Sequence, residues 1–559
     1  MHYCLLSRIC GNVDKPAPAI LIEAGHHGPT ETLTRGRLYA LALATGEFFR
    51  ELGLEPGDRV ASLLPTGRPL LQCIFGAWAA GAVVTVLAPT IEGGRSSLSL
   101  DRLGEMLRTV RPKVVVASGD EAALIGPIVA GLGADLLVPA DLPAPGNDLR
   151  LGREHVIGSE DPAFIQFTSG STGAPKAVVI EHGQLVKNIV TTAQWTGFSG
   201  DDSFASWLPL HHDFGFVVGL MMPLYFGAGL ALLPTESFTK NPISWLKLLH
   251  DCRATFSGAP PSGLAILTKR AFYNRAKSID LRHIRRIFVG AEPVSYVEGA
   301  DFEDLYANFG LKKGVISPAY GMAEATLTVS VRQEFSQRKT AHISGPQFYK
   351  EGRVVLCDSK SEGAVTLFSN GPPIPGVQVR ILDEADHQQR EGVQGRIVIS
   401  STMVTRRYLG LDENPQPGGW LETGDLGFLL EGEVYVTGRS KDVIIRNGVN
   451  MPAHMIEQAA LERFSDIALR AVAFAVPDER SLRDEVIVGV ELRRWPPDEA
   501  LPRAIRASIQ SDLNFQVDRV VPLQKGSIPR TTSGKIQRSQ ARDLFRSGEL
   551  ALARDEEVA

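Results

Sequence analysis

Short runs of apolar, mostly β-branched residues alternate along the chain with longer stretches whose apolar positions recur at helical spacing. Because the short runs are apolar at consecutive positions, they are typical of strands covered on both faces. Such strands are predicted at 60–64, 83–87, 113–117, 228–233 and 284–289, and a helix is predicted at 70–80. This alternation predicts an α/β fold in which layered, parallel β-sheets are packed with helices.

One stretch, from Phe214 to Pro234, contains no charged residue and is long enough to raise a membrane-spanning interpretation. Glycines and a proline interrupt it, and His211-His212-Asp213 directly precedes it. We therefore expect a buried helix followed by a buried strand, in a protein that is not transmembrane.

Composition narrows the class of protein. A chain of 559 residues is too long for one ordinary core, so we expect several domains. Hydrophobic residues make up 44% and charged residues 22%, and the net charge of -5 gives no reason to expect a nucleic-acid partner. The five cysteines have no CxxC spacing, which indicates neither a disulfide framework nor a zinc site. No signal peptide is recognisable at the start, so the cytoplasm is the expected location.

The pattern changes after Gly438. Beyond it, a strand is predicted at 486–490, helices are predicted at 455–464 and 501–513, and a lysine-bearing loop lies near the end. These elements predict a small α+β lid domain at 439–559, which follows a large N-terminal domain at 1–438.

The segment FTSGSTGAPK, at 167–176, concentrates hydroxyl groups, glycines and a lysine between two apolar runs. Amides freed by the glycines can turn toward a phosphate, the hydroxyls add donors, and the lysine supplies a point charge. The residues concerned are Thr168, Ser169, Gly170, Ser171, Thr172, Gly173 and Lys176. Because apolar runs flank the loop, it is expected to join two strands, and the Walker A spacing is absent. A plain Ser/Gly-rich surface turn is the alternative.

Further motifs follow this loop in order. They are GAEP at 290–293, YGMAEAT at 320–326, TGDLG at 423–427, GRSKD at 438–442 and SGK at 533–535. With this set the chain resembles the ANL superfamily of adenylate-forming enzymes, which includes acyl-CoA synthetases, luciferases and peptide-synthetase adenylation domains. The resemblance extends from about residue 32 to about residue 545, and it implies that the lid domain is mobile.

Within that superfamily the chain resembles the fatty acyl-AMP ligase branch. The run WLPLHHDFGFVVGL at 207–220, the run YGMAEATLTVS at 320–330 and extra sequence at about 332–370 carry this likeness. At the place of the segment at about 332–370, members of this branch carry an insertion that disfavours the conformation in which CoA is used. A tolerated surface loop is the alternative for this segment.

The resemblance implies ATP-dependent activation of a hydrophobic carboxylic acid to acyl-AMP, with release of pyrophosphate and with Mg2+ as cofactor. The acyl group would then pass to a phosphopantetheine thiol on a carrier protein, or to a separate thioester-forming partner. A complete acyl-CoA ligase that uses CoA, and a non-catalytic nucleotide-binding homologue, are the alternatives. Pro452 lies one residue earlier than in the family's pattern, in the segment that reorganises for thioester formation, so the second half-reaction is in question.

The resemblance also implies roles for individual residues. Thr168 to Lys176 would hold the β- and γ-phosphates, Glu324 would bind magnesium, and the catalytic Lys535 would reach both the carboxylate and the α-phosphate. Adenine would be enclosed by Gly290, Ala291, Glu292, Tyr320, Gly321, Met322 and Ala323. Asp425 would accept hydrogen bonds from the ribose hydroxyls, Arg439 would add a donor, and Lys441 would be the hinge.

The acid is expected to meet His212, Asp213, Phe214 and Gly219, with His212 near the carboxylate. Without an FDxS-like segment, amino-acid substrates are disfavoured. Taken singly, several of these residues have ordinary structural explanations: a charge at a helix N-terminus for Glu324, core packing for Tyr320, a turn for Asp425 and a hydrogen-bonded core histidine for His212.

Overall fold

The computed structural model describes most of the chain. The described residues are 5–10, 20–22, 30–89, 91–92, 95–96, 100–144, 153–169, 175–276, 278–292, 296–333, 339–411, 415, 419–477, 484–494, 500–530 and 535–550. They divide into two compact units. Unit 1 comprises Met1–Arg338, Asn370–Val379 and Ile399–Leu421, and unit 2 comprises Lys339–Ser369, Arg380–Val398 and Glu422–Ala559.

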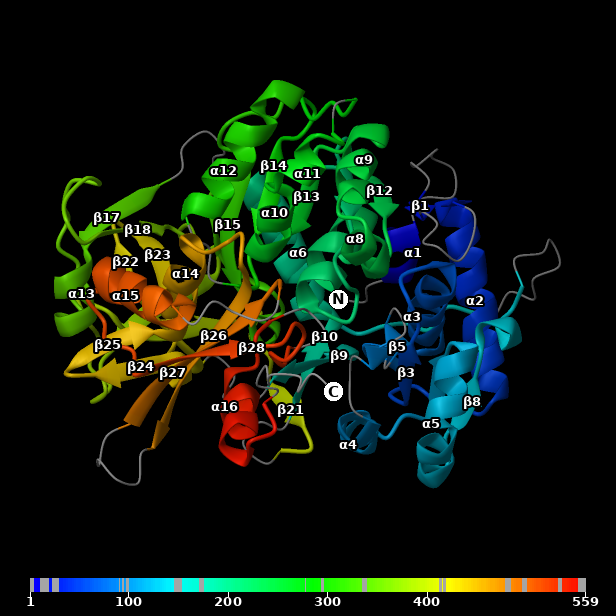
Figure 1. The fold of residues 1–559 in the computed structure, drawn as a ribbon. Helices are drawn as coiled ribbons and strands as arrows, with labels where there is room; N and C mark the ends of the chain where they lie inside the picture. The colour runs from blue at the N-terminus through cyan, green and yellow to red at the C-terminus, as the bar shows by residue number, and fades with distance from the viewer. Residues whose placement is uncertain are drawn as a thin grey trace. The chain divides into compact units, whose positions relative to one another are not determined.

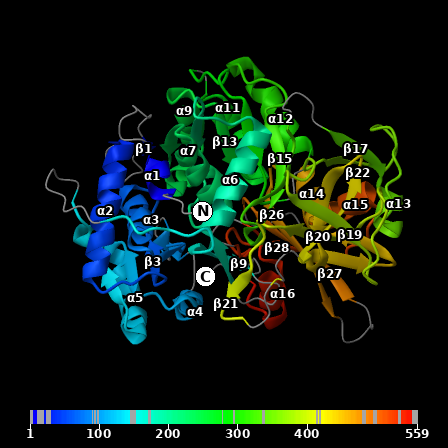
Figure 2. The same ribbon diagram turned by 180° about the vertical axis from the view of Figure 1, so that it is seen from behind.

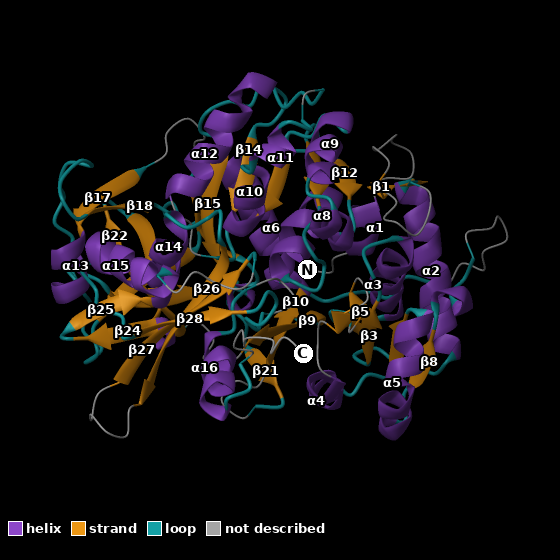
Figure 3. Ribbon diagram, in the orientation of Figure 1, coloured by secondary structure: helices purple, strands orange, loops and turns teal. Residues whose placement is uncertain are grey.

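Unit 1 is built on two large sheets that alternate with helices (Figures 1 and 3). The first has eight strands, parallel from β15 to β1 and antiparallel at both edges. Their order is β16 (Thr328–Val331), β15 (Ile316–Gly321), β14 (Arg286–Val289), β13 (Phe256–Ala259), β11 (Ser203–Ser206), β12 (Gly229–Leu232), β1 (Ile20–Ile22) and β2 (Glu31–Leu33).

The second sheet of unit 1 has seven strands and is parallel from β9 to β8. Their order is β21 (Arg407–Leu409), β10 (Pro175–Glu181), β9 (Pro162–Ser169), β4 (Val83–Val86), β3 (Arg59–Leu63), β7 (Val114–Ala117) and β8 (Asp135–Leu137). A two-stranded ribbon, β5 (Ile91–Glu92) with β6 (Arg95–Ser96), also belongs to this unit.

Helices cover both faces of these sheets. They are α1 (Leu5–Cys10), α2 (Arg35–Glu51), α3 (Arg68–Ala80), α4 (Leu100–Val110), α5 (Gly119–Leu132), α6 (His182–Thr196), α7 (Met222–Phe226), α8 (Thr235–Lys240), α9 (Ile243–Asp251), α10 (Pro261–Leu267), α11 (Arg270–Tyr273) and α12 (Tyr296–Tyr306). One core joins strands of both sheets to α2, α3 and α6, and a second lies where α9, α10 and α12 cover the eight-stranded sheet.

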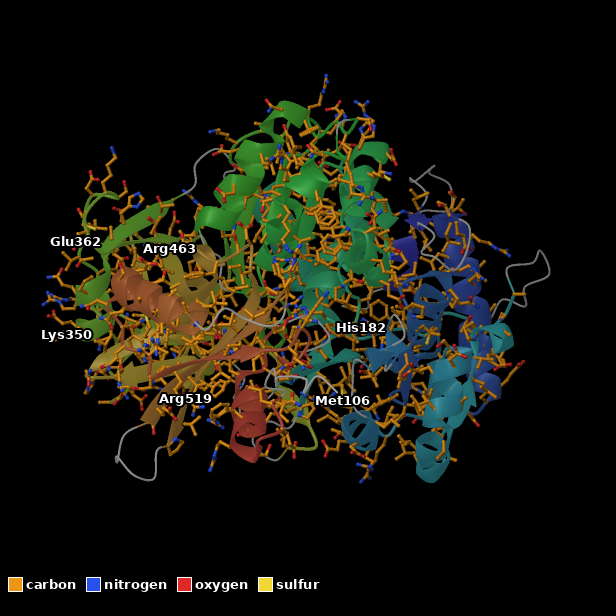
Figure 4. The ribbon with its side chains drawn as sticks, in the orientation of Figure 1. Met106, His182, Lys350, Glu362, Arg463 and Arg519 are labelled. Carbon is orange, nitrogen blue, oxygen red and sulfur yellow. The ribbon has the colours of Figure 1, made fainter. Side chains whose placement is uncertain are left out.

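The largest core of unit 1 centres on Trp78, which is fully buried in α3. Its indole Nε1 donates a 2.8 Å hydrogen bond to the carbonyl of Ala163 in β9. The ring of His182 meets it edge-on with 4.9 Å between ring centres, and Figure 4 shows where His182 lies. Helix α2 packs closely on α3, because a Cβ added at Gly76 would lie 2.5 Å from Thr45 Cγ2. Helix α3 is therefore fixed on both sides, by β9 and by α2.

Unit 2 contains the remaining strands and helices, and Figure 2 shows β19 and β20 from behind. Its strands are β17 (Thr340–Ser344), β18 (Ala364–Phe368), β22 (Leu421–Leu430), β23 (Glu433–Arg439), β24 (Val443–Arg446), β25 (Val449–Pro452), β26 (Ala468–Pro477), β27 (Asp484–Leu492) and β28 (Arg519–Leu523), with residues 380–382 of β19 (Val377–Leu382) and residues 395–398 of β20 (Gly395–Ser401). Its helices are α13 (Gly345–Glu351), α14 (Ala453–Glu462), α15 (Leu501–Leu513) and α16 (Arg538–Ser547).

The predicted strands and helices are confirmed, with ends that differ by a few residues. The uncharged stretch after Asp213 forms a buried π-helix at Phe214–Met221, then α7 and the buried strand β12. Throughout the described ranges, no helix combines the length and the apolar character needed to cross a bilayer. The structural alternative for Asp425, a turn at TGDLG, is wrong: Asp425 lies inside β22, where only Gly424 takes a positive φ, of 74°.

The segment at 332–370 is not a surface loop where it is described. It folds as β17, α13 and β18, and Phe348 and Tyr349 are only 2% and 6% exposed. Both residues belong to a core that also contains Ile444, Met451 and Ile456. The two compact units therefore do not coincide with the domains 1–438 and 439–559. Compactness does not reveal which segments move together, so that boundary stays a prediction.

Candidate active site

The phosphate loop is framed by two paired strands. β9 and β10 run antiparallel, with Ser169 opposite Pro175 and Thr168 opposite Lys176. Thr168 and Lys176 are half-buried at the end of this pair that carries the loop. The turn itself, with Gly170, Ser171, Thr172 and Gly173, lies outside the described residues, as does the side chain of Ser169. The expected strand–loop–strand arrangement is confirmed.

Lys176 lies against an aromatic ring that sequence analysis did not select. β21 pairs antiparallel with the other edge of β10, with Tyr408 opposite Val178. The Nζ atom of Lys176 is 5.3 Å from the centre of the Tyr408 ring, within the range of a cation–π contact. Burial raises the pKa of Tyr408, and the nearby charge of Glu324 raises it further. The surroundings of Tyr408 thus include the charges of both Lys176 and Glu324, which were predicted from separate motifs.

Glu324 lies in a short 3-10 helix, Ala323–Ala325, that is held by side chains from other elements. From α6, the amide Nδ2 of Asn188 donates to the carbonyls of Ala325, at 3.2 Å, and Thr328, at 3.1 Å. The backbone N–H of Thr405 donates to the carbonyl of Glu324 at 2.6 Å. The glutamate is therefore presented by a turn with fixed geometry.

Thr326 follows this turn in a strained conformation. Its φ is +68°, which is rare for a β-branched residue, and it is completely buried. Its hydroxyl donates a 2.8 Å hydrogen bond to the carbonyl of Met403. Strain of this kind persists where the surroundings fix it, and it is concentrated at functional sites.

A second strained residue marks the segment predicted to enclose adenine. Ala291, after the end of β14, has a φ of +70°. A Cβ at the preceding Gly290 would lie 3.0 Å from the carbonyl oxygen of Ala319. The carboxylate of Glu292 accepts hydrogen bonds from the backbone and the hydroxyl of Ser262, at 3.1 and 3.0 Å. Glu292 thus fixes this segment to the start of α10.

Tyr320 and Gly321 end β15, the strand next to β14, and Met322 and Ala323 directly follow it. Tyr320 is 8% exposed, Ala323 is buried, Met322 is half-buried and Gly321 is exposed. A Cβ at Gly321 would lie 2.2 Å from the carbonyl oxygen of Leu327, so only glycine fits at this position. Because Tyr320 is buried, core packing remains the alternative to enclosing adenine as its main role.

The residues predicted to meet the acid are linked directly to the phosphate-loop strand. The side-chain amide of Gln166 in β9 donates a 2.6 Å hydrogen bond to the carbonyl of His211. His212 Nδ1 is 2.5 Å from Asp213 Oδ1, and the backbone N–H of Phe214 donates to the same oxygen at 2.7 Å. The backbone N–H of Phe214 also donates to His212 Nδ1, at 3.2 Å, so Nδ1 is engaged within the turn and Nε2 of the half-buried His212 is left for other partners.

Asp213 therefore caps the π-helix Phe214–Met221 that follows it, and its exposed fraction is 6%. π-Helical turns occur frequently at functional sites. A Cβ at Gly219 would lie 2.7 Å from the Ser206 hydroxyl, so Gly219 allows this helix to approach β11 closely. Phe214 is 7% exposed. These residues form the buried support of the histidine turn.

The other predicted residues lie in unit 2. Asp425 in β22 and Arg439 in β23 are cross-strand partners, and Arg439 Nε lies 3.1 Å from Asp425 Oδ1. Lys441 is exposed in the turn Ser440–Asp442. Lys535 is half-buried between Arg530 and α16, next to an isolated bridge that pairs Arg530 with Ile536. Ser533 and Gly534 lie outside the described residues.

The residues present are compatible with magnesium. Among the described side chains, no group of three or more His, Cys, Asp and Glu residues could hold a metal ion. Mg2+ does not need such a group, because it often binds through one carboxylate, water and substrate phosphates. Glu324, fixed near the phosphate-loop lysine, fits that pattern.

Comparison with known proteins identifies this arrangement. The family model described as AMP-binding enzyme matches residues 11–409. The chain belongs to the AMP-binding enzyme family. The family's members use ATP to adenylate their substrates, so this family member is an acid-activating ligase. The predicted relationship to fatty acyl-AMP ligases is also confirmed by its relatives.

Among the relatives is the long-chain-fatty-acid–AMP ligase FadD26 of Mycobacterium bovis, 30% identical over 93% of this chain and 92% of its own length. The medium-chain-fatty-acid–[acyl-carrier-protein] ligase JamA of Moorena producens is 29% identical over 89% of this chain and 87% of its own length. A solved structure from work on the fatty acyl-adenylate ligases of E. coli and L. pneumophila is 28% identical, with a TM-score of 0.87 over 97% of both chains. The expected α/β fold is thereby confirmed.

Sequence analysis missed three residues that organise this site: Tyr408, Asn188 and Thr405. Asn188 had a weak signal, as a polar residue among the buried apolar positions of α6. Tyr408 and Thr405 had none, because their contacts join segments that lie far apart in the chain.

Proposed function

We propose that this AMP-binding enzyme activates a hydrophobic carboxylic acid with ATP, forming acyl-AMP and pyrophosphate in the cytoplasm. The observation that carries this proposal is the Lys176–Tyr408 contact at the loop end of the β9–β10 pair, with the charge of Glu324 acting on the same tyrosine. A cation for phosphate oxygens and a carboxylate for magnesium are what adenylate formation requires, because neutralising charge matters more there than acid–base catalysis.

The roles of the residues follow from this chemistry. Thr168 and Lys176 hold the β- and γ-phosphates, and pyrophosphate leaves when the carboxylate oxygen attacks the α-phosphorus. Glu324 would hold Mg2+, which when bound supplies further neutralisation of the phosphate oxygens. Asp425 accepts hydrogen bonds from both ribose hydroxyls, and Arg439 adds a donor. Lys535 reduces the repulsion between the carboxylate and the α-phosphate.

His212 has a role in orienting the acid. Its Nδ1 atom is engaged by Asp213 and by the Phe214 N–H, so Nε2 is the ring atom left to contact the carboxylate end of the substrate, as an N–H donor. Asp213 orients His212 and the π-helix from its own turn, and with Phe214 and Gly219 it is expected to meet the acid. The Gln166–His211 hydrogen bond couples this turn to the phosphate-loop strand. The acid and the phosphates would thus be positioned by one framework.

The reaction is proposed to stop at acyl-AMP, with transfer to a phosphopantetheine thiol on a carrier protein or to a separate thioester-forming partner. Support comes from the packing of α13 on the β24–β25 hairpin and α14. A lid that swings at Lys441 would have to leave Phe348 and Tyr349 behind, exposing two buried aromatic side chains. At about 25 cal/mol per Å2 of apolar surface, that costs several kcal/mol. JamA, named for ligation to an acyl carrier protein, is a precedent for the transfer.

A split-reaction assay tests this function. The enzyme is incubated with ATP, magnesium and a panel of aliphatic, aromatic and polycyclic acids, and acyl-AMP is followed by mass. CoA or a holo-carrier protein is then added. We expect acyl-AMP that CoA does not consume and that a suitable carrier does consume. Acyl-CoA appearing at a matching rate would identify a complete acyl-CoA ligase, and no ATP–pyrophosphate exchange with any acid would indicate a non-catalytic homologue.

A further inference from the structure

Arg538, the first residue of α16, connects two acidic residues from different parts of unit 2. Its Nε and Nη2 atoms donate to the two carboxylate oxygens of Glu457, at 2.8 and 2.7 Å. Its Nη1 atom donates to Asp442 Oδ2 at 2.8 Å. The side chains of Arg538 and Asp442 are each 20% exposed and that of Glu457 is 7% exposed. A two-point guanidinium–carboxylate contact fixes orientation as well as distance.

Each partner of Arg538 is itself attached to a defined element. Glu457 lies in α14, and its Oε1 atom also accepts a 3.0 Å hydrogen bond from the backbone of Ala473 in β26. Asp442 ends the turn Ser440–Asp442, directly after Lys441. Arg538 therefore holds this turn, a helix and a strand at one point.

The same point is the base of the loop that carries Lys535. Two residues separate Lys535 from Arg538. The base of the loop is closed by the Arg530–Ile536 bridge and by a 2.9 Å hydrogen bond from Gln537 N–H to the Pro529 carbonyl. Backbone contacts thus close the loop on itself. Arg538 ties the closed loop to the turn that contains Lys441.

We propose that Arg538 is a positioning residue for Lys535, which transmits the orientation of the Ser440–Asp442 turn to the catalytic lysine. This inference rests on the role of Lys535 in the proposed function. Removing the guanidinium releases the base of the loop from the Ser440–Asp442 turn. The ammonium group of Lys535 then occupies its productive position for a smaller fraction of the time. Because a misplacement of about 1 Å can cost roughly 100-fold in rate, the expected loss is on the order of 10- to 100-fold in kcat.

A double-mutant cycle tests this role. Rates of acyl-AMP formation are measured in single turnovers for the wild type, Arg538→Ala, Lys535→Ala and the double variant, with thermal unfolding followed for each. We expect Arg538→Ala to lower kcat and to change KM for ATP little, and we expect the double variant to be no slower than Lys535→Ala. Arg542→Ala, an exposed position on the same helix, is the matched control and keeps the wild-type rate.

Two further measurements separate positioning from general support. Added guanidinium ion restores part of the rate of Arg538→Ala and none of the rate of Lys535→Ala. Asp442→Asn, which breaks only the link to the turn, slows the reaction without adding to the loss in Arg538→Ala, and it serves in the cycle if Arg538→Ala does not fold. If Arg538→Ala slows the Lys535→Ala variant by the same factor as it slows the wild type, the inference is overturned. A wild-type rate in Lys535→Ala would instead contradict the proposed function.

Discussion

Asp425 and Arg439 face each other across β22 and β23, with Arg439 Nε 3.1 Å from Asp425 Oδ1. The carboxylate is 6% exposed, whereas 43% of the arginine side chain is exposed. A buried carboxylate with an arginine at its edge is held in one rotamer. It can then accept two hydroxyl hydrogen bonds without reorganising, which is the property a ribose site needs.

We therefore expect Asp425→Asn to weaken ATP binding. A hydrogen bond to a charged acceptor contributes about 1.5–3 kcal/mol, so KM for ATP should rise roughly 10- to 100-fold. The acid dependence should change little. Initial rates at varied ATP measure this, with Glu422→Gln as the control, since that exposed carboxylate lies on the same strand and pairs with Arg396. An unchanged KM for ATP would leave Asp425 with a structural role only.

Tyr408 is expected to act through the face of its ring. Tyr408→Phe keeps the cation–π contact with Lys176, whereas Tyr408→Leu removes it. Such contacts are worth about 0.5–2 kcal/mol, so Tyr408→Leu should raise KM for ATP roughly 2- to 30-fold, with Tyr408→Phe close to the wild type.

Equilibrium binding of ATP, measured by calorimetry, separates this effect from turnover. If Tyr408→Phe is impaired as much as Tyr408→Leu, the hydroxyl group is responsible and the ring contact is not. In a Lys176→Ala background the two Tyr408 variants should bind ATP equally, because the cation that distinguishes them is gone.

The sequence predicted the elements of this fold better than its contacts. Consecutive apolar runs such as Val114–Ala117 have a direct physical cause in burial on both faces, and they formed strands as expected. TGDLG misled because glycine and aspartate are turn residues, although apolar Leu421 and Phe428 on either side belong to one strand. The hairpin between β24 and β25 had an unused signal, since Asn447-Gly448 favours a two-residue turn, and both residues have positive φ, of 52° and 76°.

Contacts between distant segments were beyond the sequence. The order of the motifs identified Lys176 and Glu324. Tyr408, whose surroundings include both charges, comes from β21, and no local sequence pattern predicts that β21 pairs with β10. Likewise, nothing in 345–351 indicates that α13 packs on the hairpin after Lys441. Such contacts depend on how complete sheets are assembled, and periodicity in a short window carries no information about that.

The core beneath α13 is expected to restrain the lid. Phe348 is 2% exposed, and its ring centre lies 5.7 Å from that of Phe428. Phe348→Ala should destabilise unit 2 by about 3–5 kcal/mol and loosen α13 from α14. Acyl-CoA, absent or minor with the wild type, should then increase while acyl-AMP formation persists. Mass detection of both products measures this.

Lys350→Ala, on the same helix, is the matched control, because it leaves the aromatic core intact and should leave the product ratio unchanged. A destabilised Phe348→Ala protein that still makes only acyl-AMP would show that this packing supports the fold without restricting the second half-reaction.

His182 should make unit 1 sensitive to acid. Burial lowers the pKa of His182 to about 3, from an ordinary value of 6.5, and a contribution from Asp161 opposes this only in part. Between these two values the unfolded chain binds a proton that the folded chain does not, so stability falls as the pH falls below 6.5. From pH 7 to pH 5 this one group should remove about 2 kcal/mol.

Urea unfolding followed by tryptophan fluorescence reports this loss of stability, because Trp78, Trp195, Trp207 and Trp245 all lie in unit 1. His182→Phe keeps a ring against Trp78, and between pH 7 and pH 5 it should lose about 2 kcal/mol less stability than the wild type. His387→Gln, at an exposed position, should behave as the wild type. Equal losses in all three proteins would place the acid sensitivity elsewhere in the chain.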